Sequence, residues 1–194
     1  MLNDALNYAR RGHPVFPCGI DKKPLVQNGF HAATTDEEQI RSWWEKWPNA
    51  SIGIPTGPDI DAFVLDIDLP DGPNSLATLE AKHGPLPSTL EQTTGSGGCQ
   101  LFFKWPKAGP GVRNSVGKLG LGLDIRGAGG YVIVPPSGHP SGGHYTWKKG
   151  HVRQRGVNSG VLEVALGQAA LGGIWAGCAS FGWVLSSAMA STCM

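Results

Sequence analysis

The sequence predicts an α+β domain, and three of its features lead to that prediction. Amphipathic helical patterns occur mainly in the first half of the 194 residues. Short runs rich in β-branched and aromatic residues gather between residues 90 and 134. Twenty-nine glycines and fifteen prolines are spread along the chain and indicate many turns. Early helices and late strands favour separate helical and antiparallel parts over an alternating βαβ order.

Each expected element has a local reason. Residues 1–11 place apolar side chains at helical spacing, and Gly12 ends that helix. Thr35 and Glu38 have the spacing of a capping box, which predicts a helix that begins there and ends before Pro48. A third helix is expected over residues 74–83. Strands are expected over residues 14–18, 51–54, 63–68, 90–94, 100–105, 122–126 and 131–134.

The strand over residues 63–68 ends in two acids one residue apart. Because strand side chains alternate, Asp66 and Asp68 are expected to point to the same face. Two neighbouring carboxylates repel each other unless a cation lies between them or water surrounds both. The following Pro70-Asp71-Gly72 is strong turn chemistry, so a solvated turn is the alternative interpretation of the pair.

Two glycine-rich stretches supply groups suited to phosphates. The sequence TGSGG at residues 94–98 opens a strand and brings backbone N–H groups close to any anion bound there. In LDIRGAGG at residues 123–130, Asp124 and Arg126 share one face of a strand that ends in a second glycine-rich turn. Three carboxylates suit Mg²⁺ or Mn²⁺, and cations with N–H groups suit phosphates. The combination predicts a two-metal phosphoryl-transfer site.

From about residue 5 to residue 147, the chain resembles the bifunctional primase/polymerase domain of the archaeo-eukaryotic primase superfamily. The resemblance implies an antiparallel or mixed sheet flanked by helices over residues 1–150, leaving 151–194 as a tail. The matching motifs are ARRG with PVFP, KPL, GF, ATTD, WW with Pro48, IGIPTG, the Asp66-x-Asp68 pair, GSGG, DIRG with GGY, PPSGH and HYTW.

The resemblance also implies an activity, its cofactors and its partners. The activity is template-directed nucleotidyl transfer in plasmid or phage replication, with nucleoside triphosphates as substrates and two Mg²⁺ or Mn²⁺ ions. A 3′-hydroxyl would attack the α-phosphate and release pyrophosphate, with the ions on Asp66, Asp68 and Asp124. The implied partners are a single-stranded DNA template, a primer and a replicative helicase domain or protein. The implied nucleotide-binding residues are Ser96, Gly97, Gly98, Arg126, Gly127, Gly129 and Gly130.

One position departs from the family pattern and keeps two other functions open. Where the family has a motif histidine after the GSGG turn, this chain has Gln100, which we expect in the catalytic cleft. A neutral amide donates a hydrogen bond but supplies neither a proton nor a positive charge. One alternative is therefore a catalytically weakened module that binds nucleotides or nucleic acid. The other is a two-metal nuclease or phosphohydrolase, because three carboxylates alone do not separate these reactions.

Cysteine usage and the tail complete the expectations. Four cysteines without a Cys-x-x-Cys pair, and no leader pattern, indicate a reducing, cytoplasmic compartment without structural zinc. Residues 164–194 carry no charge, and the tail is disordered, helical or membrane-associated. Because glycines, serines and Gln168 make residues 171–190 only weakly hydrophobic, a membrane span is the less favoured choice. A histidine metal site and base-stacking by most tryptophans are likewise less favoured than packing roles.

Overall fold

A computed structural model describes residues 1–109 and 111–148 of the chain. Its helices are α1 (Leu2–Arg10), α2 (Glu37–Lys46) and α3 (Gly72–His83), with short 3-10 helices at Gly29–Ala32 and Pro58–Ile60. The strands are β1 (Phe16–Cys18), β2 (Ser51–Thr56), β3 (Ala62–Ile67), β4 (Leu90–Thr93), β5 (Cys99–Lys104), β6 (Ser115–Val116), β7 (Leu123–Arg126), β8 (Gly130–Val134) and β9 (Thr146–Trp147).

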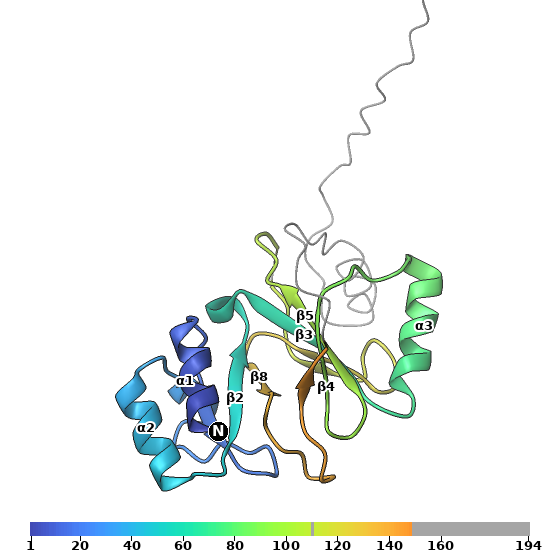
Figure 1. Cartoon of the computed structure of the whole chain (residues 1–194). Helices are drawn as coiled ribbons and strands as arrows, with labels where there is room; N and C mark the ends of the chain where they lie inside the picture. The colour runs from blue at the N-terminus through green and yellow to red at the C-terminus, as the bar shows by residue number, and fades with distance from the viewer. Residues whose placement is uncertain (110, 149–194) are drawn as a thin grey trace, which may run out of the picture.

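The strands form two antiparallel sheets, so the α+β prediction is confirmed. The smaller sheet has the order β1-β2-β8 and the larger one the order β6-β7-β3-β5-β4-β9. Every strand pairing in both sheets is antiparallel. In Figure 1, α1 and α2 lie together beside β2, and α3 lies at the opposite end of the molecule.

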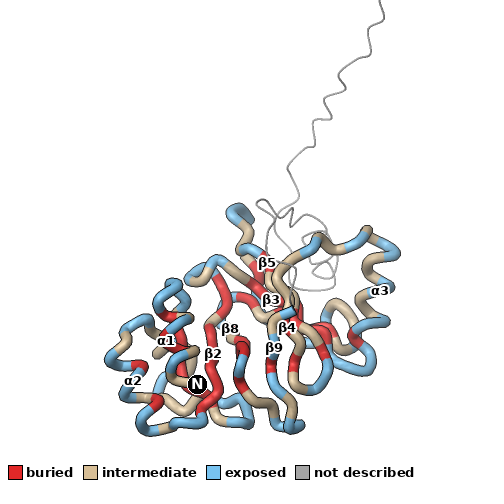
Figure 2. Tube along the Cα trace, in the orientation of Figure 1, coloured by how far each residue is buried: buried red, intermediate tan, exposed pale blue. Residues whose placement is uncertain are grey.

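Nearly all of the central strand β3 is buried (Figure 2), and its two faces contact different apolar clusters. Phe63, Leu65 and Ile67 lie in one apolar cluster, against which Leu76 and Leu79 of α3 pack. Val64 belongs instead to the cluster of α1, α2 and the smaller sheet. Because strand side chains alternate, Asp66 shares the face of Val64 and points away from the α3 side. The face that carries Asp66 is therefore the one directed toward the smaller sheet.

The smaller sheet is held by the first two helices. Ala5, Leu6 and Ala9 of α1 and Ile40 and Trp44 of α2 are the buried residues of these helices, as their apolar spacing predicts. They pack against the strand residues Ile52, Ile54, Val132 and Val134. A second, smaller cluster on this sheet consists of Phe16, Cys18, Ile133 and Tyr145. Helices α1 and α2 thus pack against the smaller sheet and stabilise it.

Several element boundaries differ from the prediction. The α2 N-cap is Asp36, whose carboxylate accepts a hydrogen bond from the Glu38 amide at 3.0 Å, so the expected Thr35 capping box is wrong by one residue. The Asp side chain there satisfies an unpaired N–H as well as a threonine would. Two-residue strands β6 and β9 were not predicted, because so short a run has no measurable alternation.

The expectations for the tail lie outside the described residues. Among residues 1–109 and 111–148, no helix is long and apolar enough to span a bilayer. The boundary proposed at residue 150 and the possible membrane segment over residues 171–190 both remain predictions.

Candidate active site

The predicted site residues come together because of the strand register in the larger sheet. Asp66 of β3 lies directly opposite Gln100 of β5 on one side and opposite Asp124 of β7 on the other. Directly paired residues point to the same face of a sheet. Gln92 of β4 pairs with Gln100 in the same way, so one row of polar side chains crosses four strands. This polar row, Gln92-Gln100-Asp66-Asp124, is the centre of the candidate site.

Asp66 is the more deeply buried of the two acids in the row. It is 7% exposed, and its Oδ1 atom has no hydrogen-bond partner among the described residues. Burial, and then the charge of Asp68, raise the pKa of Asp66 to about 6, although Gln100 and Arg126 oppose the shift. A buried carboxylate oxygen without a partner is the kind of group that a cation binds.

Arg126 forms an ion pair with both acids of the row. Its Nη2 lies 2.9 Å from Asp124 Oδ2 and 3.8 Å from Asp66 Oδ2. The other oxygen of Asp124 accepts a hydrogen bond from the Gly117 backbone N–H at 3.0 Å. The sequence predicted Arg126 near the acids as a nucleotide-binding residue. The structure places it near them, but its guanidinium pairs with the carboxylates themselves.

Asp68 completes the acidic group from the end of β3. It follows the last strand residue, is exposed, and its charge acts on Asp66. We expected the three acids at the C-terminal ends of adjacent strands, which is wrong for Asp124. Because β3 and β7 are antiparallel, Asp66 near the end of β3 meets Asp124 near the start of β7.

The Gly-Ser turn lies against the same end of β3. A Cβ atom added to Gly98 would be 2.6 Å from Ile67 O and 3.5 Å from Asp68 Cα, so only a glycine fits there. Gly97 has a positive φ of 92°, and its N–H donates to Thr94 O at 3.0 Å. Ser96 Oγ lies 3.0 Å from Thr94 Oγ1. Gly98 thus lies next to Asp68, and Gly97 and Ser96 belong to the same turn.

The second glycine-rich turn is engaged in internal packing. The Gly127 N–H donates to Asn114 Oδ1 at 2.7 Å, and the Gly130 N–H donates to Gly127 O at 3.0 Å. Added Cβ atoms at Gly127 and Gly130 would overlap Val112 O and Asn114 Oδ1. The expectation that Gly127, Gly129 and Gly130 bind phosphate therefore needs a correction: two of these three N–H groups are already used. Close packing explains Gly127 and Gly130, and a positive φ of 80° explains Gly129.

Two residues near the acids escaped the sequence analysis. Gln92 is fully buried, and its Nε2 donates to Gln100 Oε1 at 2.5 Å. Tyr145 is 2% exposed, and its pKa is raised by burial and then by the charges of Asp66 and Asp68. A polar residue at an inward position of β4 was the available signal for Gln92. Tyr145 lies in the HYTW motif that matches the family, but the sequence analysis assigned it no role at the site.

The acids of the site have the chemistry of ligands for a divalent cation. Carboxylate oxygens are the ligands that Mg²⁺ and Mn²⁺ prefer, and Asp66 Oδ1 is a buried acceptor without a partner among the described residues. However, no group of three or more His, Cys, Asp or Glu side chains within the described ranges is arranged to hold a metal ion. The Arg126 guanidinium occupies the space between two of the carboxylates. The residues fit such an ion by the chemistry of their oxygens.

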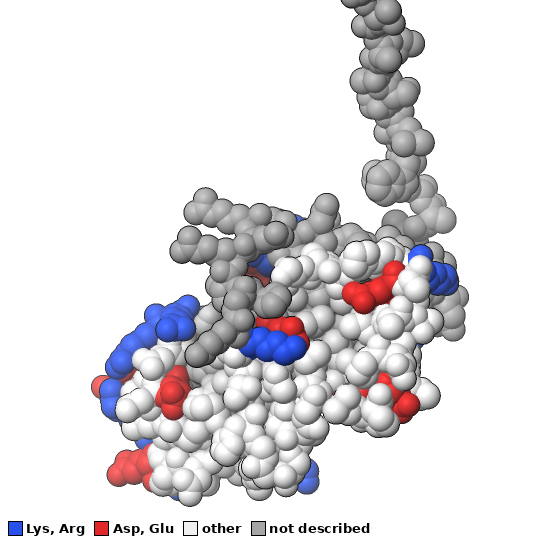
Figure 3. All heavy atoms as spheres, turned by 45° about the vertical axis from the view of Figure 1, so that its right-hand side comes forward, with Lys and Arg blue, Asp and Glu red and all other residues white. Residues whose placement is uncertain are grey.

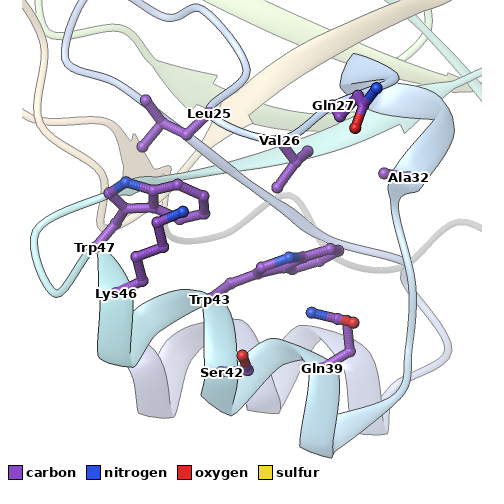
Figure 4. Close-up of a pocket in the computed structure, with 9 residues that line it drawn as sticks. All are labelled: Leu25, Val26, Gln27, Ala32, Gln39, Ser42, Trp43, Lys46 and Trp47. Atoms are coloured by element: carbon purple, nitrogen blue, oxygen red, sulfur yellow. The ribbon is translucent and has the colours of Figure 1, made fainter.

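The surface offers two further observations. A pocket of about 420 Å³ lies between α2 and residues 25–32, lined by residues that include Trp43, Trp47 and Lys46 (Figure 4). None of the predicted site residues lines it. Figure 3 shows a largely uncharged face on which the basic and acidic side chains form small, separate groups. Residues 100–130 contain five basic side chains, and four of them are exposed: Lys104, Lys107, Arg113 and Lys118.

Comparison with known proteins now adds to the geometry. A search of curated proteins finds no match to this sequence. The family model described as bifunctional DNA primase/polymerase, N-terminal, matches residues 5–160. That range contains both sheets, all three aspartates and the Gly-Ser turn. The chain therefore belongs to the family of bifunctional DNA primase/polymerase N-terminal domains.

Proposed function

We propose that the protein catalyses template-directed nucleotidyl transfer as a DNA primase/polymerase of a plasmid or phage. The polar row carries this proposal: two buried carboxylates, Asp66 and Asp124, face each other across β3 and β7 with Asp68 beside them. Family membership supplies the class of reaction. The substrates are nucleoside triphosphates, a primer and a single-stranded DNA template, and a replicative helicase is the expected partner.

Each residue of the site has a role in this proposal. Asp66, Asp68 and Asp124 would hold two Mg²⁺ or Mn²⁺ ions, which supply charge neutralisation at the phosphates. The Gly-Ser turn lies beside Asp68; its Gly97 N–H already donates to Thr94 O, so the N–H groups of Ser96 and Gly98 are the ones that would suit the triphosphate oxygens. Arg126 would exchange its carboxylate partners for a phosphate, because a guanidinium binds either anion in a bidentate way. Gln100 would donate one hydrogen bond to a phosphate oxygen.

A weakened, binding-only module is the second candidate, and Gln100 favours it. The amide at this position keeps a hydrogen bond but has no positive charge. Hydrogen bonds that involve an ionised group are about twice as strong as neutral ones, and an imidazolium donor would add its own charge, which the amide lacks. If the missing interaction acts mainly in the transition state, transfer slows more than binding weakens. Nucleotide binding with little extension is the result that this candidate expects.

Primer extension with purified protein tests the proposal. The assay uses a labelled primer on a single-stranded template, all four nucleoside triphosphates, and either Mg²⁺ or Mn²⁺. The control is the double variant Asp66→Asn, Asp68→Asn, which keeps the side-chain size but removes two charges. Metal-dependent extension by the wild type and none by the control would support the proposal. Equal extension by both proteins, or template degradation instead of extension, would overturn it.

A further inference from the structure

The side chain of Gln92 lies fully buried where the two sheets approach each other. It is 0% exposed, and its Nε2 atom makes two hydrogen bonds in opposite sheets. One goes to Gln100 Oε1 at 2.5 Å within the larger sheet, and the other goes to the Ile133 backbone oxygen at 2.7 Å in β8 of the smaller sheet. The two hydrogens of the amide nitrogen are thereby both used.

These contacts fix the orientation of two amides. A backbone carbonyl oxygen only accepts hydrogen bonds, so the Gln92 atom that faces Ile133 O has to be the nitrogen. The Gln100 atom that faces this nitrogen has to be an acceptor, and it is therefore Oε1. The opposite orientation of Gln100 would place two donors against each other. The Ile133 carbonyl thus determines, through Gln92, which way the Gln100 amide points.

The consequence concerns the acidic side of the row. With its oxygen bound to Gln92, Gln100 directs its own Nε2 away from Gln92. Asp66 lies directly opposite Gln100 in the strand register, so on this side the Gln100 amide meets a carboxylate, and a carboxylate requires a donor. Gln100 therefore presents N–H groups, and not its carbonyl oxygen, to the side of the row where anionic oxygens would bind.

Packing alone does not explain an amide at position 92. The Gln92 Oε1 atom is buried and has no hydrogen-bond partner among the described residues. A buried acceptor without a partner costs free energy. A methionine at position 92 would have a similar volume and would lack this oxygen. The amide therefore carries a cost to stability that its donor function would offset.

We propose that Gln92 is a positioning residue that holds Gln100 with its N–H donors toward the carboxylates and the phosphate of a bound nucleotide. The part of this inference that concerns phosphate rests on the proposed function. The part that concerns the orientation of Gln100 rests on the hydrogen bonds alone. Two measurements therefore test the two parts separately.

The first measurement follows the Gln100 side-chain amide by NMR in protein labelled with ¹⁵N at glutamine. The signal is assigned by its loss in Gln100→Met. In the wild type, the Gln100 amide is expected to be rigid, and in Gln92→Met it is expected to become mobile on the picosecond-to-nanosecond timescale. The matched control is Gln39→Met, an exposed glutamine on α2. A rigid Gln100 amide in Gln92→Met would overturn the inference, whatever the protein catalyses.

The second measurement is a double-mutant cycle on nucleotide affinity in Mn²⁺. Gln92→Met should weaken binding of a nucleoside triphosphate by about 3- to 10-fold, the range for one lost hydrogen bond. It should have no further effect in Gln100→Met, because the residue that it positions is then absent. Equal effects of Gln92→Met in both backgrounds would show a merely structural role and overturn the inference. Urea unfolding checks that Gln92→Met is folded under the conditions of the assay, because the change leaves Ile133 O and Gln100 Oε1 without their donor.

The outcomes separate this inference from the proposed function. If the wild type binds no nucleotide in Mg²⁺ or Mn²⁺, the proposed function fails, and the NMR result still decides the orientation of Gln100. If the wild type binds nucleotide and the NMR result is negative, only the role of Gln92 fails.

Discussion

At the scale of single residues, the site depends on which side chains of a strand share a face. Gln100 and Cys99 are neighbours in β5, yet Gln100 lies in the polar row and Cys99 packs against the apolar cluster on the α3 side. Asp66 and Ile67 are divided between the same two faces. A substitution at one position is therefore expected to act on chemistry, and a substitution at the next position to act on packing.

The Gln100→His variant is the sharpest test of the departure from the family pattern. An imidazole returns a group that can carry positive charge next to Asp66, so extension should rise about ten-fold or more. Cys99→Ala should change extension little, because its side chain lies on the opposite face. Single-turnover rates in Mn²⁺ measure both effects. If wild type extends briskly and Gln100→His changes nothing, residue 100 does not limit the reaction.

Asp66 is expected to reduce stability at neutral pH. Its pKa is raised to about 6, so the folded protein binds a proton more tightly than the unfolded chain does. The proton on Asp66 therefore stabilises the folded protein fully below about pH 4. This stabilisation is lost as the pH rises through about 6. Asp66→Asn should raise the free energy of unfolding at pH 7 by up to about 3 kcal/mol, the limit for a shift of about two pKa units.

Urea unfolding of wild type and Asp66→Asn at pH 4, 5.5 and 7 without divalent ions checks this expectation. The difference between the two proteins should shrink toward pH 4, where Asp66 is protonated in the wild type. An Asn variant that is less stable than wild type at every pH would show that the Asp66 charge is compensated by its neighbours.

At the scale of elements, antiparallel pairing decides which segments meet. The sequence patterns located most of β2, β3, β4, β5, β7 and β8, because these strands have apolar alternation or turn residues at their ends. Which strands are neighbours was not predictable from alternation alone. β3 lies between β5 and β7, so the acids of residues 66 and 124 meet although 58 positions of sequence separate them. The second glycine-rich turn misled the prediction, because Gly residues fit close packing as well as phosphate binding.

Gly98→Ala should damage the Gly-Ser turn where it meets β3. The new methyl group would lie 2.6 Å from Ile67 O, so the turn has to move away from Asp68 at a cost of about 1–3 kcal/mol. Nucleotide affinity in Mn²⁺ should fall with it. Gly138→Ala is the matched control, since its nearest contact is the flexible end of Ile20 at 3.3 Å. Equal losses in both variants would argue against a special role of the turn.

At the scale of the whole molecule, the candidate site lies on the face of the larger sheet that is directed toward the smaller sheet. The Gln92 hydrogen bond to Ile133 connects the two sheets at this point. All of the elements involved fall within residues 1–148, and the family match ends at residue 160. The fold class and the carboxylates were predictable from local patterns, whereas the contact between the sheets depends on long-range packing that no local pattern encodes.

A chain that ends at residue 160 is therefore expected to keep its nucleotide affinity. The structural reason is that both sheets and every residue of the polar row precede this point. Titration of a nucleoside triphosphate in Mn²⁺, with urea unfolding of both chains, measures the effect. A truncated chain that fails to fold would mean that residues 161–194 belong to the domain.

The location of bound Mn²⁺ is the most direct test of the proposed metal site at the three aspartates. Crystals grown with Mn²⁺ and a non-hydrolysable nucleoside triphosphate give an anomalous difference map that locates the ions without reference to activity. Under the proposed function, Mn²⁺ contacts the carboxylates of Asp66, Asp68 and Asp124, and Arg126 moves from between Asp66 and Asp124 onto a phosphate. Mn²⁺ bound elsewhere, with Arg126 still 2.9 Å from Asp124, would contradict it.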